Sequence, residues 1–362
     1  MSRRAVTAAA VLTLLAGAAA PASDVSETHG LKVRSYDRRT GRLSARLAAD
    51  RSDYLNGVFV LKKVAIRSYG AGGSIVDTSA PAGRYEKEKG FATLTGDVRV
   101  TYQPVDGTDE RADIRLKNLE WTQGADVLTS DSEVDARFLR GGRAVAELKG
   151  RGLEIDTASG LIRLAKPEVM KLRGGLGLIG RLDRPATGSS DGRPVTVRSK
   201  GPIRLVMPKA DDPLLRISVK NDVTVTEPEG SLGCDGLTLA LRREGPAGGM
   251  EAGGYLLDSA EATGDVSFRS GESTATAPRA EYAGAADLLL LSGDGKEGAT
   301  LTRQGQTLAA PRILIDRRNR KTTTGGKGDT RLTIRRPEEA VKPRGGAVED
   351  DGGTGTAGPV SE

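Results

Sequence analysis

Apolar and polar residues alternate in short runs from about residue 31 to residue 336. In the run from 92 to 102, Leu94, Val98 and Val100 share one face, and Thr, Asp and Arg residues occupy most of the other. Such alternation is typical of β-strands with one buried and one solvated face. The best helical candidate, Leu43 to Tyr54, can equally be read as a strand followed by a loop. The pattern recurs in runs that contain Val134, Ala136, Phe138, Leu205, Ile217, Leu239 and Ile334.

An internal repeat accompanies the strand pattern. Matching segments keep their order at offsets of 168, 161 and 160 residues. Trp121 and Tyr282 occupy corresponding places, either filling a sheet face or lining a binding trough. The matching pairs are Ala92–Val98 with Ala260–Val266, Glu120–Leu128 with Glu281–Leu289, and Leu153–Asp156 with Ile313–Asp316.

Length and composition agree with two folded units. A chain of 362 residues exceeds the size at which one hydrophobic core usually keeps growing. The 48 Gly residues suit many tight turns, because Gly readily adopts the positive φ that such turns need. We therefore predict an all-β protein with a first unit at 31–175, a linker or long loop at 176–199, a second unit at 200–336 and a disordered tail at 337–362.

The N-terminal 22 residues have the layout of a secretory signal peptide. Arg3 and Arg4 precede an apolar run from Ala5 to Ala20, and Ala20-Pro21-Ala22 fits a small-residue cleavage site. As a helix the run would span roughly 24 Å, short of the roughly 30 Å hydrocarbon core. We expect export to the periplasm with cleavage, or tethering to the inner membrane by a retained N-terminal helix.

Catalytic chemistry finds little support. The chain has one His and one Cys, so His29 and Cys234 cannot build a histidine cluster or a disulfide within the chain. Cys234 is expected to be a small buried residue. The formal charge of +6 is too evenly interspersed to indicate nucleic-acid binding. We expect no cofactor, no metal and no enzymatic activity.

Acidic pairs could in principle serve acid–base catalysis, but solvated loops explain them more simply. The two Thr-Gly-Asp-Val segments could bind calcium through Asp97 and Asp265, whereas a hairpin turn is the expected alternative. Gly96, Gly152 and Gly264 are expected at turns or bulges. The acidic pairs are Asp109 with Glu110, Asp131 with Glu133, and Asp211 with Asp212.

The ordered series of motifs resembles the periplasmic bridge proteins of lipopolysaccharide export. The first half is similar to LptC and the second to LptA, or OstA-like, proteins. The LptC-like segments are Leu94–Val98, Leu119–Trp121, Leu128–Val134 and Lys149–Asp156, and the LptA-like segments are Asp235–Leu239, Ala262–Val266, Ala280–Tyr282 and Leu289–Gly293. Family relatives of the first half usually have one domain, whereas this chain carries a second unit.

The resemblance implies two tandem open, twisted β-jellyrolls whose apolar interior holds the acyl chains of lipid A. The implied function is non-enzymatic transport of lipopolysaccharide, or a similar anionic glycolipid, from the inner to the outer membrane. The alternative is a cell-envelope scaffold or adhesin with a filled core. The residues expected to line the trough are Leu94, Val98, Val100, Trp121, Leu128, Val134, Ala262, Val266, Phe268 and Tyr282.

The resemblance also implies partners. These are inner-membrane ABC transporter subunits, which would supply the energy, and other jellyroll bridge proteins that pair through edge strands. Strands near Leu31 to Arg46 and Arg331 to Arg336 are the expected outer edges, although their Arg residues could equally prevent pairing.

Overall fold

The computed structural model describes most of the chain. The described residues are 26–37, 40–70, 73–104, 110–125, 127–173, 179, 194–208, 212–243, 255–295, 297–325 and 333–335. The expected signal or anchor at 1–22 and the expected tail at 337–362 lie outside them. Within the described residues, no helix is long and apolar enough to cross a membrane.

The described residues form 21 strands in a single sheet, and the all-β prediction is confirmed. The strands are β1 (Ser26–Tyr36), β2 (Leu43–Leu55), β3 (Val58–Tyr69), β4 (Ile75–Glu86), β5 (Phe91–Gln103), β6 (Glu110–Thr122), β7 (Val127–Arg140), β8 (Arg143–Asp156), β9 (Leu161–Leu172), β10 (Val195–Arg198), β11 (Ile203–Val206), β12 (Leu214–Glu227), β13 (Gly230–Arg243), β14 (Tyr255–Ser270), β15 (Ser273–Ala283), β16 (Leu288–Ser292), β17 (Ala299–Arg303), β18 (Gln306–Ala310), β19 (Arg312–Asp316), β20 (Lys321–Gly325) and β21 (Thr333–Arg335).

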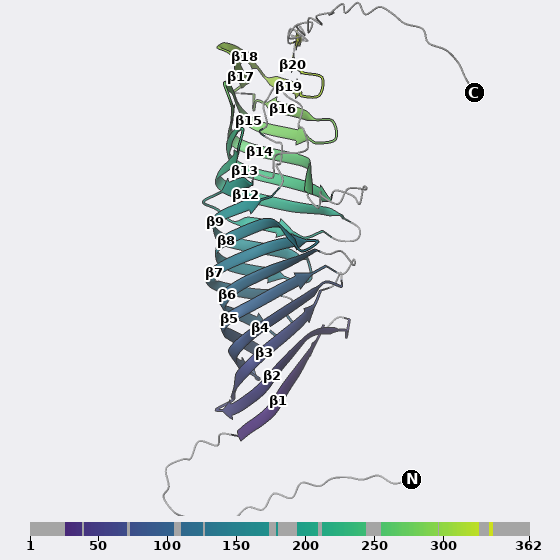
Figure 1. Ribbon diagram of the computed structural model, residues 1–362, viewed down its shortest axis with the longest axis vertical. Helices are drawn as coiled ribbons and strands as arrows, with labels where there is room; N and C mark the ends of the chain where they lie inside the picture. Colours follow the sequence, from purple (N-terminus) through teal and green to yellow (C-terminus); the bar gives the residue numbers. More distant parts are fainter. Residues whose placement is uncertain are drawn as a thin grey trace, which may run out of the picture.

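The strands are antiparallel, and most of them pair with their neighbours in the sequence; near the C-terminal end β16 pairs with β15 and β19, and β17 pairs with β15 and β18. From β1 to β9 every strand is followed by its hydrogen-bonded partner. β10 and β11 together occupy the next place, because both pair with β9 on one side and β12 on the other. Figure 1 shows the strands stacked along the longest axis, from β1 at one end to β20 near the other.

The sheet continues across the region where a linker was expected. Residues 195–198, inside the expected linker of 176–199, form β10. Val197 of this strand lies opposite Met170 of β9 and Val225 of β12. The first and second halves are therefore joined by main-chain hydrogen bonds as well as by the chain itself.

The long strands bend near their middles. In β5 the register shifts between Thr95 and Val98, and Gly96 there has a φ of 103°. A Cβ at Gly96 would also lie 2.5 Å from Cγ of Pro81, so glycine is needed at this position. Bulges bend the strand that carries them, and here they fall on consecutive strands. We call this line of bulges the crease; its register shifts include Thr95/Val98, Leu116/Glu120, Ser130/Glu133, Lys149/Gly150, Lys220/Val223, Gly233/Gly236 and Thr263/Val266.

The expectation of hairpin turns at the two Thr-Gly-Asp-Val segments is wrong. Both segments lie inside strands, β5 and β14, and form bulges of the crease. Gly264 and Asp265 have φ values of 73° and 42°, so this left-handed pair inserts a bulge without ending the strand. The bulge alternative for Gly96 and Gly264 is confirmed.

The crease divides the sheet into two halves, which we call the first and second walls. The edges of the walls farthest from the crease, which we call the margins, lie against each other. The first margin carries the turns after β1, β3, β5 and β7, and the second margin carries the turns after β2, β4, β6 and β8. Ser74, in the turn after β3, donates a hydrogen bond to the Thr157 carbonyl in the turn after β8 at 3.4 Å. Gln123, in the turn after β6, donates to the Arg34 carbonyl of β1 at 3.4 Å. We call this contact line the seam.

Candidate functional site

The space between the walls is lined by apolar side chains that stand in register. One row follows the second wall, between the crease and the second margin, and each member lies directly opposite the next on the neighbouring strand. Its repeat-related parts match, because Ala92 pairs with Trp121 as Ala260 pairs with Tyr282. The row runs Tyr54, Phe59, Tyr85, Ala92, Trp121, Leu128, Ile155, Ile162, Leu205, Ile217, Leu239, Ala260, Tyr282, Leu289 and Ile315.

A second row follows the first wall. Its one polar member is Thr78, which is 2% exposed and whose hydroxyl has no hydrogen-bond partner. The row runs Val33, Leu47, Ile66, Thr78, Val100, Ile114, Ala136, Leu148, Met170, Val197, Val225, Leu232, Phe268, Ala275, Leu301 and Leu308.

The structure brings the sequence-predicted site residues to this interior, on both walls and beside the crease. Val100 and Phe268 belong to the first-wall row, and Trp121, Leu128 and Tyr282 belong to the second-wall row. The exposed fractions are 0% for Leu94 and Val98, 1% for Val100, Leu128 and Val266, 2% for Trp121, 3% for Ala262 and Phe268, 4% for Val134 and 6% for Tyr282. The interior is thus closed at these positions, and an acyl chain could contact them only if the walls moved apart.

The seam is where such a movement would occur. The two hydrogen bonds described across it, from Ser74 and Gln123, are long. Farther along, the Arg140 guanidinium lies 5.8 Å from the centroid of the Tyr255 ring. Gly70 approaches closely, because a Cβ there would lie 2.2 Å from the Thr157 carbonyl oxygen. Polar and van der Waals contacts of this kind can break without disrupting the hydrogen bonds of the sheet.

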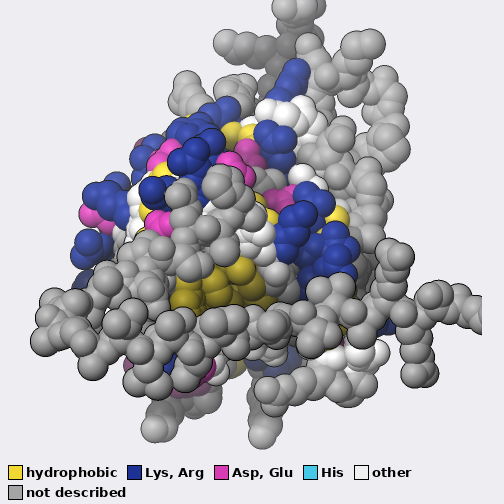
Figure 2. Space-filling view, turned by 90° about the horizontal axis from the view of Figure 1, so that it is seen from below, with side chains coloured by type: hydrophobic (Ala, Val, Ile, Leu, Met, Phe, Trp, Pro, Cys, Tyr) yellow, Lys and Arg dark blue, Asp and Glu magenta, His cyan; other side chains and the backbone are white. Residues whose placement is uncertain are grey.

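At the β1 end the interior opens to solvent. Tyr54 is 41% exposed and Leu55 39%, while Leu31 and Phe59 are only partly buried. Figure 2, which looks at this end, shows hydrophobic side chains in the centre with Lys and Arg side chains around them. We call this opening the mouth.

Aromatic rings are concentrated at the mouth. Tyr54 and Phe59 have ring centroids 4.8 Å apart, and Phe59 and Tyr85 have theirs 6.3 Å apart. The Tyr85 hydroxyl donates to Gln123 Oε1 at 2.9 Å, and burial raises the pKa of this phenol. Three of the first four residues of the second-wall row are therefore aromatic, although aromatic residues make up only 3% of the chain.

At the other end, sequence reasoning missed a buried cluster. The Arg317 side chain is fully buried, and its Nε and Nη2 donate to Asp287 Oδ1 at 2.8 and 2.6 Å. Nη2 also donates to the Tyr282 hydroxyl at 2.9 Å, and burial raises the pKa of that phenol. The Tyr282 ring is thus held in place through its hydroxyl. Arg317 corresponds to Thr157 in the repeat, so the sequence offered no signal for this cluster.

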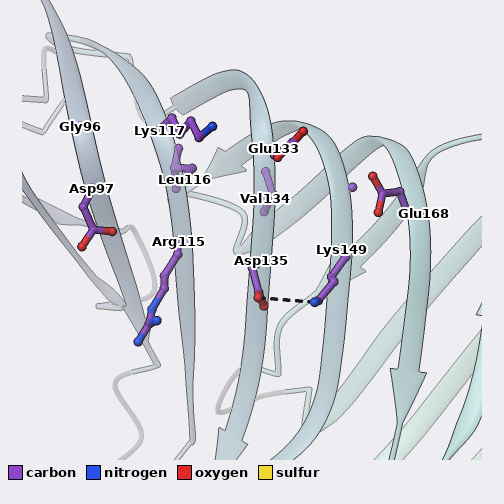
Figure 3. Close-up of a pocket in the computed structure, with 11 residues that line it drawn as sticks. Gly96, Asp97, Arg115, Leu116, Lys117, Glu133, Val134, Asp135, Lys149 and Glu168 are labelled. Carbon is purple, nitrogen blue, oxygen red and sulfur yellow. Dashed lines mark ion pairs between the residues drawn. The ribbon is translucent and has the colours of Figure 1, made fainter.

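A charged hollow of about 510 Å³ lies on the outer side of the crease. Figure 3 shows Lys149 directed at Asp135, and their Nζ and Oδ2 atoms are 3.8 Å apart. Cations and carboxylates are mixed, so neither sign of ligand is favoured. The lining residues are Gly96, Asp97, Arg115, Leu116, Lys117, Glu133, Val134, Asp135, Lys149, Gly150 and Glu168.

The expectation that the acidic pairs lie in solvated loops is wrong for Asp131 and Glu133, which are exposed but lie within β7, and for Glu110, which begins β6 and is 4% exposed. Asp131 accepts a hydrogen bond from Asn118, Glu133 lies 3.7 Å from Arg151, and Asp97 pairs with Arg99. Among the described residues, no group of three or more His, Cys, Asp or Glu could hold a metal ion. Asp109 and Asp211 lie outside the described residues, as does the side chain of His29.

Comparison with known proteins gives no family assignment. No protein-family model matches the chain, and no curated protein matches it.

Proposed function

We propose that this protein carries lipopolysaccharide, or a similar anionic glycolipid, across the cell envelope, with the lipid's acyl chains held between the two walls. The two walls act as an open, twisted β-jellyroll, and the protein performs no covalent chemistry. It is exported to the periplasm and receives its lipid from an inner-membrane ABC transporter, which supplies the energy.

The observation that carries the proposal is the pair of inward rows. The second-wall row crosses fifteen strand positions, which at about 4.8 Å per strand is a path of roughly 70 Å. Burial of apolar surface is worth about 25 cal/mol per Å², so a continuous apolar path lets an acyl chain advance without exposure to water. A path of this kind suits transfer along the protein better than storage at one point.

The ends of the sheet favour assembly with similar proteins. β1 is paired on one side only, by β2, among the described strands, so its other edge can accept a strand. β1 and β21 lie within or beside the two segments expected as outer edges. We propose that neighbouring bridge proteins pair with these edges and extend the apolar path.

Photocrosslinking tests the transport proposal. A photoreactive amino acid at Val98 or Val266, which are 0% and 1% exposed, should give an adduct with lipopolysaccharide in cells that make it. The matched controls are Arg99 and Ser267, the next residues on the same strands, which are exposed on the outer face. Equal adducts from both faces, or adducts from neither, would refute a lipid path between the walls.

The closed interior favours a second candidate function, that of a cell-envelope scaffold or adhesin with a filled core. All ten proposed lining residues are 6% exposed or less, as a permanently packed core would require. Mass spectrometry of lipids that co-purify with the protein separates the two. A stoichiometric glycolipid supports the carrier, whereas its absence from protein isolated with intact membranes supports the scaffold.

A further inference from the structure

The first three strands carry an excess of positive charge. Residues 26–37 and 40–70 contain eight Lys and Arg residues but four acidic residues, and all eight cations are exposed. The eight are Lys32, Arg34, Arg42, Arg46, Arg51, Lys62, Lys63 and Arg67.

Several of these cations lie directly opposite one another on neighbouring strands. Arg34 of β1 faces Arg46 of β2, which in turn faces Arg67 of β3. Arg51 and Lys62 form a second facing pair of like charges. Like charges directly opposite each other destabilise a sheet, so this arrangement carries a cost within the isolated protein.

Arg34, Arg46 and Arg67 begin a row of outward-facing residues that continues across the next strands. In the rest of this row, opposite charges face each other. Arg67 pairs with Asp77 at 2.6 Å, and farther along the row Arg137 faces Asp113 and Glu147. Signs alternate there, as sheet stability favours. By contrast, Arg34 and Arg46 have no ion pair with a described residue, and Arg46 lies 6.0 Å from the Tyr69 ring centroid. Single pairs of facing cations also occur farther along the sheet, as at Arg99 with Arg115. Among the described strands, however, three cations in succession face one another only at the mouth, where Arg34, Arg46 and Arg67 do so.

Apolar and aromatic side chains lie beside these cations. Tyr54 and Leu55 are exposed at the mouth, and the partly buried Leu31 and Phe59 lie behind them. Tyrosine is favoured at a membrane surface, because its ring is apolar and its hydroxyl remains in water. The combination of basic and aromatic residues fits the headgroup region of a bilayer.

The sequence just before β1 also indicates that the mouth lies near a membrane. Only five residues separate the apolar run that ends at Ala20 from Ser26, where β1 begins. Five residues can span at most about 18 Å when fully extended. A segment of Ala5–Ala20 inserted in a bilayer would therefore keep the mouth close to the headgroups.

We infer that the β1–β3 end docks on an anionic bilayer surface, with its Lys and Arg side chains on the headgroups and its mouth facing the membrane. Neighbouring strands are about 4.8 Å apart, so all three strands lie within roughly 10 Å of the end. This is comparable to the Debye length of about 8 Å at physiological salt, so the cations act together on the surface. The inference does not depend on the proposed lipid path.

Vesicle flotation with the full chain tests this inference. Binding should be stronger to vesicles of phosphatidylcholine with phosphatidylglycerol than to phosphatidylcholine alone, and added salt should weaken the difference. The triple variant Lys32→Gln, Arg34→Gln, Arg46→Gln should lose on the order of 100-fold of the anionic-vesicle binding, since each basic residue near the surface contributes about a tenfold factor or less. The vesicles contain no lipopolysaccharide, so the result is independent of the crosslinking experiment.

A matched control removes the same charge elsewhere. Arg198→Gln, Arg204→Gln, Lys220→Gln changes three exposed cations on β10 to β12, in the middle of the molecule, and should bind as the parent does. The mouth variant should melt no lower than the parent, because it relieves repulsion between facing cations. Equal binding to both vesicle types, equal loss in both triple variants, or a lowered melting temperature of the mouth variant would overturn the inference.

Discussion

The buried ion pair between Arg317 and Asp287 gives a sharp test of how the second half is held together. Asp287 lies in the turn between β15 and β16, and Arg317 follows β19, so the pair joins two turns of the second margin. We consider Asp287→Asn, which keeps the size of the side chain and removes its charge. Asparagine also tolerates the φ of 52° that Asp287 adopts.

The magnitude follows from burial. The side chains of Arg317 and Asp287 are 0% and 9% exposed, so solvent cannot replace the lost carboxylate. Removing one partner of such a pair leaves an uncompensated buried charge, at a cost of about 3–5 kcal/mol. An exposed pair provides the control: Asp212→Asn, next to Arg216, should cost about 1 kcal/mol or less, since those side chains are 43% and 49% exposed.

Urea unfolding followed by far-UV circular dichroism measures the change in the free energy of unfolding. Each strand mainly contacts its neighbours, so Asp287→Asn should destabilise the region from β15 to β20 most. Trp121 is the only tryptophan, and its fluorescence reports the first half separately. The double variant Asp287→Asn, Arg317→Met should recover much of the lost stability. A loss below about 1 kcal/mol for Asp287→Asn would show that solvent reaches the pair and that our account of its burial is wrong.

Three further predictions concern single side chains. Burial, with a smaller effect of the neighbouring Asp235 carboxylate, raises the pKa of the Cys234 thiol to about 12. A thiol reagent at pH 8 should therefore modify Cys234 only after unfolding, and rapid reaction of the native protein would contradict this. Gly70→Val should force the seam apart at the Thr157 carbonyl, cost about 1–3 kcal/mol and increase the binding of an apolar dye, whereas unchanged dye binding would count against an opening seam. Hydrogen bonds from Asn319 lower the pKa of Asp316 below 3.8, so its stabilising effect is present above that value and is lost as the pH falls through the lowered pKa. Asp316→Asn should therefore cost less than about 1 kcal/mol at pH 7 and nothing in strong acid, as unfolding curves at both pH values will show.

The sequence alone determined the strands and the face that each presents to the interior. Period-two alternation is a local property, so it placed Leu94, Val98 and Val100 correctly on the buried face. The repeat correctly paired Trp121 with Tyr282, which lie in one row although they are 161 residues apart. Leu43 to Tyr54, which could have been a helix, belongs to β2, because its buried residues Ala45, Leu47 and Ala49 alternate.

Only the tertiary structure decided how the strands enclose a space. The Gly-Asp pairs are compatible with either a hairpin turn or a bulge, and the choice depends on whether the neighbouring strand continues past them. The seam and the Arg317–Asp287 pair arise from contacts between residues that are 30 to 89 positions apart in the sequence. Such contacts depend on the bend and twist of the whole sheet, and a pattern that repeats every two residues carries no information about either.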